Sequence, residues 1–299
     1  MTNINNTNNF DNSRLQNFAL GATGAVVGFE AEPIIKRYIN KPVTKKVIKN
    51  IRTIQNGNFK SYIEKALDQN NLRDSLKILD LNAQTKNDVL KYLQDLTSND
   101  AKPNFIKKIL NKFLRRGFKV KNPIPATLQG FQAFCIPSKN TVVCNLDKFG
   151  APIFHEIAHK LNYQSKNIIV NTLSKIRNPL ATWGTLCVSV IALLKDAKGK
   201  RSEPKNGFQK ATNFVKDNCG LCATATMLPL TIEEIIANIK GTKIAKKAGV
   251  TGDLLNKVKK CHKTSIISYS VTAIVTGLSV FLASKLRDLI CSKKVNNTN

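Results

Sequence analysis

The sequence is poor in acidic and in aromatic residues. Lys and Arg number 47 against 19 Asp and Glu, a formal net charge of +28 over 299 residues, and aromatic residues make up 7%. Such a balance suits nucleic acid or an anionic membrane surface, unless it only reflects a Lys/Asn/Ile-rich composition. A nucleic-acid module would interleave aromatic side chains with a basic stripe, whereas here they are scattered. We therefore expect membrane lipids as a partner and no specific nucleic-acid binding.

A disulfide framework is also missing. The seven cysteines are an odd number spread from residue 135 to residue 291, unlike the pattern of a small secreted scaffold. Cys219 and Cys222 form a single CxxC in an apolar run, with no second pair to complete a metal site. We expect the cysteines to be reduced and packed.

Histidine is scarce, yet two of the three histidines form the arrangement His155-Glu156-x-x-His159. On a helix, residues four apart share a face, so both imidazoles can bind one Zn²⁺. Glu156 then stands beside the first ligand, where it can take a proton from the water that the zinc activates. The alternative is an amphipathic helix whose histidines are ordinary core or surface residues. The spacing favours a zinc site with one Zn²⁺ per chain.

A catalytic zinc needs a third protein ligand, and a pair of glutamates opens a helix-like run some seventy-five residues later. Glu234 would complete a His₂Glu site, with Glu233 as the other choice, unless both are only carboxylates favoured near a helix N-terminus. Asn238 lies one turn beyond Glu234 and is expected to hydrogen-bond a zinc-bound histidine. If Cys261 or His262 closed the shell instead, a structural zinc would be favoured.

Two β-rich runs precede the zinc helix, at residues 132–136 and 141–145, around a turn containing Pro137. They predict a hairpin. An exposed strand edge binds an extended peptide by backbone pairing, so Ala133 and Phe134 are candidate substrate-binding residues.

Three further runs are apolar. Residues 180–194 and 219–232 are short for a bilayer crossing and fit either a membrane-inserted hairpin or two buried core helices. Residues 265–284 carry no charge over about twenty positions, the length of a transmembrane helix.

These features divide the chain into four consecutive parts. Residues 1–32 are expected to be a disordered N-terminus with a short apolar segment, and 33–122 a basic helical region. Residues 123–260 would form a domain around the zinc motif, which includes the apolar runs 180–194 and 219–232, and 261–299 the transmembrane helix and tail.

Within the basic region, apolar residues at helical spacing predict helices around residues 62–67, 76–79 and 89–96. A fourth helix is expected at 104–117, with one apolar and one cationic face, which suits either an anionic bilayer or packing on a core.

Together these motifs resemble the gluzincin metallopeptidases, and among them the membrane-embedded HtpX-like and CAAX-prenyl-protease family. The likeness covers roughly residues 128–250. It rests on the strand pair with Ala133-Phe134, on the zinc helix, and on Glu234-x-x-Ala237-Asn238-x-x-Gly241. The chain departs from the family in having Asn238 where the family has Asp.

The resemblance implies an α+β, mainly α-helical fold: a zincin-like catalytic domain with a small β-sheet and one to three membrane-associated helices. It also implies His155, His159 and Glu234 as zinc ligands and Glu156 as the catalytic base. We thus expect a membrane-associated, zinc-dependent endopeptidase acting on peptides or proteins, integral in a bacterial inner membrane through residues 265–284. The alternative is a non-catalytic basic membrane-surface or scaffold protein with a structural zinc or none.

Overall fold

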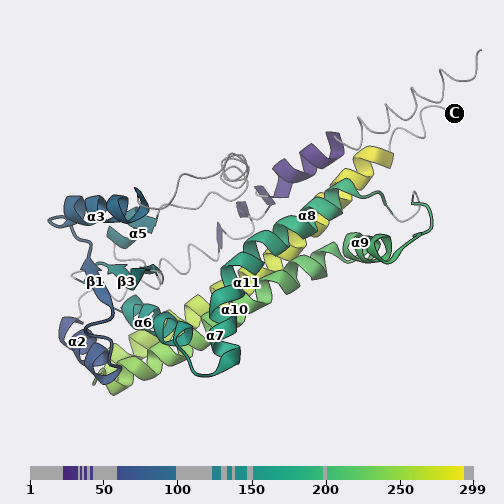
Figure 1. The fold of residues 1–299 in the computed structure, drawn as a ribbon. Helices are drawn as coiled ribbons and strands as arrows, with labels where there is room; N and C mark the ends of the chain where they lie inside the picture. Colours follow the sequence, from purple (N-terminus) through teal and green to yellow (C-terminus); the bar gives the residue numbers. More distant parts are fainter. Residues whose placement is uncertain are drawn as a thin grey trace, which may run out of the picture. The chain divides into compact units, whose positions relative to one another are not determined.

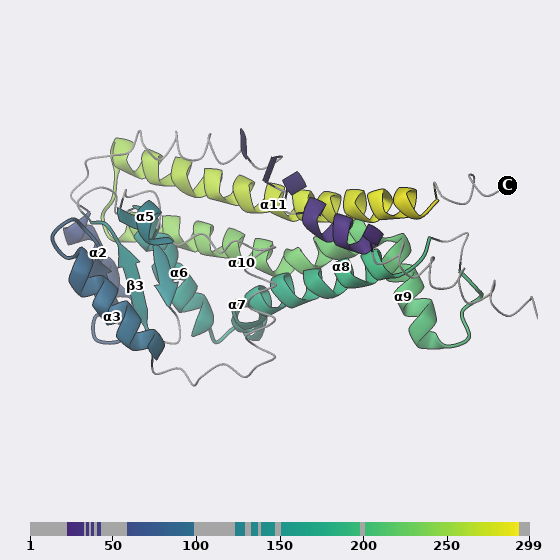
Figure 2. The same cartoon turned by 90° about the horizontal axis from the view of Figure 1, so that it is seen from above.

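A computed structural model describes residues 23–32, 34–35, 37–38, 41–42, 59–98, 123–128, 133–136, 139–146, 151–197 and 201–292. Most of these residues are helical, with one small sheet (Figures 1 and 2). The elements in chain order are α2 (Lys60–Gln69), β1 (Lys77–Asp80), α3 (Lys86–Ser98), α5 (Pro123–Leu128), β2 (Phe134–Ile136), β3 (Thr141–Cys144), α6 (Ala151–Tyr163), α7 (Ile168–Pro179), the π-helical turn η2 (Leu180–Gly184), α8 (Thr185–Leu194), α9 (Gly207–Asp217), α10 (Cys219–Lys247) and α11 (Gly252–Ser292).

The chain forms two compact units, and each draws on segments distant in the sequence. The first unit comprises Met1–Asn40, Pro179–Leu228 and Thr272–Asn299, and the second comprises Lys41–Asn178 and Pro229–Val271. The unit boundaries fall inside α10 and α11, so each of these helices contributes to both units. The four consecutive parts expected from the sequence do not coincide with these two units.

Among the described residues, three helices are long and apolar enough to cross a membrane, namely Ile168–Leu194, Cys219–Lys247 and Gly252–Cys291. The last contains residues 265–284, as expected. The other two extend well beyond the uncharged runs 180–194 and 219–232, which alone looked too short for a crossing. The helices are longer than the runs because polar residues continue the helical backbone at one end.

The sheet of the second unit has three strands in the order β1-β3-β2. Strands β2 and β3 pair antiparallel, with Cys135 opposite Val142, which confirms the predicted hairpin. Strand β1 pairs parallel to β3, with Ile78 opposite Val142. The prediction of a helix around residues 76–79 is therefore wrong. Apolar residues three apart fit a helix turn, but pairing with a strand more than sixty residues away decided the conformation.

Helices cover both faces of this sheet. Because side chains alternate along a strand, Val143 of β3 packs with Leu81 and Val89 on the side of α3 and α5. Val142 and Cys144 face the opposite side, where they join a core with Phe154 and other residues of α6. Figures 1 and 2 show α6 beside β3 in both views. All four residues of β3 are buried, as expected of a central strand.

Two further helices of the basic region agree with their predicted positions. Helix α2 buries Ile63, Ala66 and Leu67 on one side, and α3 spans the apolar repeat at residues 89–96. The predicted amphipathic helix at 104–117 and residues 1–22 of the predicted N-terminal part lie outside the described residues.

Helix α10 passes unusually close to α6 at Gly241. A methyl group at this position would lie 2.9 Å from the carbonyl oxygen of Phe154 and 3.0 Å from the amide nitrogen of His155. Only glycine permits such a backbone approach. The contact fixes the spacing between the two helices that carry the candidate ligands.

Candidate metal centre

Helix α6 carries the two histidines of the motif. Pro152 lies in the first turn of the helix, where a missing amide hydrogen costs nothing. Buried apolar neighbours, among them Ile153, Phe154 and Ile157, hold α6 in the core. His155, Glu156 and His159 are themselves buried, so their polar atoms need partners inside the protein.

The third predicted ligand comes from α10 and meets the two histidines. His155 Nε2 lies 2.8 Å from His159 Nε2 and 3.1 Å from Glu234 Oε2, and His159 Nε2 lies 3.5 Å from Glu234 Oε1. Among the described residues these three side chains form a group able to hold a metal ion, with ligand atoms within 4.8 Å of one another. Pairs of ligands about 2.0–2.1 Å from a tetrahedral ion stand about 3.3 Å apart, and the observed separations surround this value.

The hydrogen bonding of these three side chains also suits a metal ion. Within the described part of the chain, the buried Glu234 Oε2 has no hydrogen bond, although it lies 3.1 Å from His155 Nε2. Two imidazole nitrogens and a carboxylate oxygen face one another with few hydrogens to share. A cation among them would satisfy several lone pairs at once.

Glu233 turns away from the three converging ligands and binds the far side of His159. Its Oε1 lies 2.9 Å from His159 Nδ1 and accepts a second hydrogen bond from Asn162 Nδ2 at 3.0 Å. A carboxylate on Nδ1 fixes the tautomer that leaves Nε2 free to bind a metal. The choice between Glu233 and Glu234, open in the sequence, is thus decided by geometry: Glu234 faces the histidine Nε2 atoms and Glu233 orients one histidine.

Arg177 of α7 bridges the two glutamates. Its guanidinium donates to Glu234 Oε1 at 2.7 Å and to Glu233 Oε2. A single arginine cannot neutralise both of these buried carboxylates. The second positive charge has to come from a protonated His159 or from a metal ion in the same place.

The site also shifts the pKa of two titratable groups on α6, His159 and Glu156. Burial acts to lower the pKa of His159, but hydrogen bonds to Glu233 and Glu234 outweigh it and raise the pKa to about 9. Burial raises the pKa of the Glu156 carboxyl, although the neighbouring histidines partly oppose the shift. A carboxyl with a raised pKa is suited to accept and return a proton near neutral pH.

Asn238 does not make the predicted contact. Its Nδ2 donates to the backbone carbonyl of Glu234 at 2.7 Å and lies 3.5 Å from Ser265 Oγ, whereas its buried Oδ1 has no partner among the described residues. Asn238 lies one helical turn beyond Glu234, as expected, but its side-chain amide hydrogen-bonds the backbone of its own helix instead of a histidine. The role foreseen for it, orienting a histidine, falls to Glu233.

The two residues that would have closed a structural shell stand apart from it. His262 Nδ1 lies 2.7 Å from Thr242 Oγ1, and the His262 ring centroid is 6.2 Å from that of His155. Neither His262 nor Cys261 belongs to the group of ligand atoms found in the described part of the chain.

Phe134 is the first residue of β2, which is an edge strand, and Ala133 directly precedes it. Phe134 packs its side chain toward α3 and α5, and α6 packs against both β2 and β3. The edge strand β2 and helix α6, which carries the two histidines, are thus neighbours within one unit.

Sequence reasoning missed Arg177 and the part played by Glu233. The available signal was an arginine inside a long apolar helix, because a charge there usually has a partner and a role. Tyr269 of α11 was missed too. Its phenol interacts electrostatically with Glu234, Glu156 and Arg177.

No protein-family model, curated protein or solved structure matches this chain. The assignment of a function therefore depends on the residues and geometry described above.

Proposed function

We propose that this protein is a membrane-associated, zinc-dependent endopeptidase. The observation that carries the proposal is the convergence of His155, His159 and Glu234 from two helices, with Glu156 next to the first histidine. Three helices of membrane-spanning length and composition support the membrane association.

His155 Nε2, His159 Nε2 and the Glu234 carboxylate would hold the ion. Two imidazoles and a carboxylate are the ligand set of several zinc peptidases, and a set of three protein ligands suits catalytic rather than structural zinc. When bound, Zn²⁺ supplies a Lewis acid that polarises a carbonyl oxygen and makes water nucleophilic near neutral pH.

Glu156 would act as the general base. It follows His155 on α6 and is buried, so its carboxyl would lie beside the ligands, and the raised pKa of this group makes its ionised form a stronger proton acceptor. It would accept a proton from the attacking water and deliver it to the leaving amine as the peptide bond breaks.

Glu233 and Arg177 would position these groups. Glu233 holds the His159 ring through Nδ1, and Arg177 ties Glu233 to Glu234. Neither residue would bind the ion itself, and both would act by orienting the ligands. The edge strand β2 would pair with an extended substrate beside α6, with Ala133 and Phe134 at the beginning of the strand.

Metal analysis of the purified full chain tests the site. We expect about one zinc per chain in the wild type, a clear loss in Glu234→Ala, and retention in Glu156→Gln, because a base that is not a ligand is dispensable for binding. Glu203→Ala removes an exposed carboxylate and serves as the matched control, with unchanged zinc.

Peptidase activity on an unstructured protein substrate tests the reaction. Glu156→Gln should lose activity while keeping its metal, and Glu234→Ala should lose both. Zinc retained in Glu234→Ala would contradict the ligand assignment. An active Glu156→Gln variant would contradict the mechanism, and a zinc-loaded but inactive wild type would favour a structural zinc in a scaffold protein.

A further inference from the structure

Helix α9 connects two candidate membrane spans. The first ends with α8 at Leu194 and the second begins with α10 at Cys219. If both helices cross the bilayer, the connecting segment emerges at one membrane face and α9 lies close to the lipid headgroups. All of α8 and α9 and the start of α10 belong to the first unit.

One side of α9 exposes an apolar stripe formed by Phe208, Ala211 and Phe214. Phe208 is 77% exposed and Phe214 is 63% exposed, and Ala211 between them is also exposed. Residues three apart lie on neighbouring turns, so the three side chains form one continuous surface. Two phenylalanines exposed to this degree on one short helix call for a partner.

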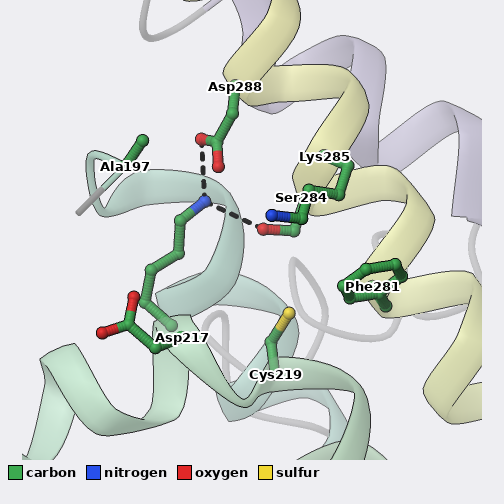
Figure 3. Close-up of a pocket in the computed structure, with 8 residues that line it drawn as sticks. Ala197, Asp217, Cys219, Phe281, Ser284, Lys285 and Asp288 are labelled. Carbon is green, nitrogen blue, oxygen red and sulfur yellow. Dashed lines mark hydrogen bonds and ion pairs between the residues drawn. The ribbon is translucent and has the colours of Figure 1, made fainter. Parts of the chain in front are cut away.

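The opposite side of α9 is fixed within the first unit by Lys216. This side chain is buried, and its Nζ donates to the Ala192 carbonyl at 2.7 Å. It also donates to Ser284 Oγ at 2.8 Å and to Asp288 Oδ1 at 2.9 Å (Figure 3). Lys216, Ser284 and Asp288 line part of a cavity of about 290 Å³. Thr212, one turn before Lys216, is also buried.

A buried ammonium group is stable only when it is well paired, so this arrangement sets how α9 is rotated. The helix cannot turn its phenylalanines inward without removing Lys216 from its three acceptors. With Lys216 paired in this way, the apolar stripe points away from the rest of the first unit.

Cations flank the stripe. Lys205 and Lys210 are exposed, and residues 195–218 contain seven Lys and Arg against three Asp and Glu. Two internal contacts hold the connecting segment in place, an ion pair of Arg201 with Asp217 and a hydrogen bond from Lys195 Nζ to Asn213 Oδ1 at 2.8 Å. A helix with an apolar stripe and neighbouring lysines is suited to an anionic bilayer surface.

We infer that α9 is an interfacial helix that inserts Phe208 and Phe214 into the headgroup region of an anionic bilayer. The inference requires the helices Ile168–Leu194 and Cys219–Lys247 to be membrane spans and is independent of the metal centre. Its effect is to hold the ends of α8 and α11, through Lys216, at a defined depth.

The single tryptophan of the chain makes a direct test possible. Trp183→Phe removes it, and Phe208→Trp then places one indole in the stripe of the full chain. The protein is reconstituted in vesicles of phosphatidylcholine and phosphatidylglycerol, with and without brominated acyl chains. Glu203→Trp in the same background is the matched control, because Glu203 is exposed in the segment before α9.

The indole at position 208 should lose most of its emission to brominated lipid and little to acrylamide in the water, whereas the indole at position 203 should behave in the opposite way. Quenching by lipid should weaken when phosphatidylglycerol is omitted. Phe214→Trp, made in the same way, is a second probe if the first variant does not fold.

Three results would overturn the inference. Quenching of the stripe by acrylamide but not by lipid would show a water-exposed helix. Protection from both quenchers would show a protein partner or a second copy on the stripe. Lipid quenching that does not depend on phosphatidylglycerol would remove the role of anionic headgroups.

Discussion

Replacing Gly241 by alanine should weaken metal binding although the residue contacts no ligand side chain. The added methyl group would lie 2.9 Å from the Phe154 carbonyl oxygen and 3.0 Å from the His155 amide nitrogen. Carbon atoms in ordinary contact stand about 3.5–4.0 Å from their neighbours, so the α6 and α10 backbones must separate by about 0.5–1 Å. Neither contact is with a flexible side chain that can move aside.

The separation acts on the metal centre because Glu234 lies about two turns before Gly241 on α10. Metal–ligand distances tolerate a change of only about 0.2 Å, so a shift of this size pulls the Glu234 carboxylate away from the two histidines. Displacing groups that support metal ligands typically costs about 10–100-fold in affinity, and we expect a loss in this range.

Stability should change less than affinity. Overpacking costs about 1–3 kcal/mol, while alanine is better than glycine in a helix by about 1 kcal/mol. The net loss should therefore be at most about 2 kcal/mol.

The assay is competition for zinc between the purified full chain and a fluorescent chelator, with thermal unfolding measured on the same samples. Gly207→Ala is the matched control, since a methyl group there meets nothing within 4 Å. A Gly241→Ala variant that bound zinc as tightly as the wild type would refute the reasoning, because the close approach of α6 and α10 would then not set the position of Glu234.

Three further predictions test other parts of the structure. Glu233→Gln keeps an acceptor for the histidine but loses the charge, so zinc affinity should fall by roughly tenfold without being abolished; abolition in the same chelator assay would make Glu233 a ligand. Burial raises the pKa of the Cys135 thiol to about 12 and raises that of Cys144 too, so both thiols are neutral at pH 8. Iodoacetamide should therefore modify them only after denaturation. Rapid modification of the native protein, detected by mass spectrometry, would contradict this burial. Gly277→Val should lower the unfolding temperature, since even a β-carbon would lie 2.0 Å from Thr224 Oγ1 and 2.4 Å from the Gly220 carbonyl oxygen. The free energy of unfolding should fall by about 1–3 kcal/mol. An unchanged midpoint of thermal unfolding would show that α10 and α11 do not meet there.

Much of the fold was predictable because it depends on local patterns. The zinc-motif helix, the hairpin and helices α2 and α3 follow from apolar spacing and turn residues within short windows. Strand β1 was missed because its partner β3 is more than sixty residues away, and four residues give no periodicity that separates a strand from a helix turn.

The candidate site divides in the same way. The sequence by itself determined that His155 and His159 share a face with Glu156 beside them, since the helical repeat sets their relation whatever surrounds them. Only the tertiary structure decided which of two adjacent glutamates faces the Nε2 atoms of both histidines. Adjacent residues on a helix point about 100° apart, and the approach of α10 to α6 at Gly241 selects Glu234. The same packing brings Arg177 of α7 to the two glutamates. The sequence could not predict these ion pairs, because no local pattern specifies the distance between residues of different helices.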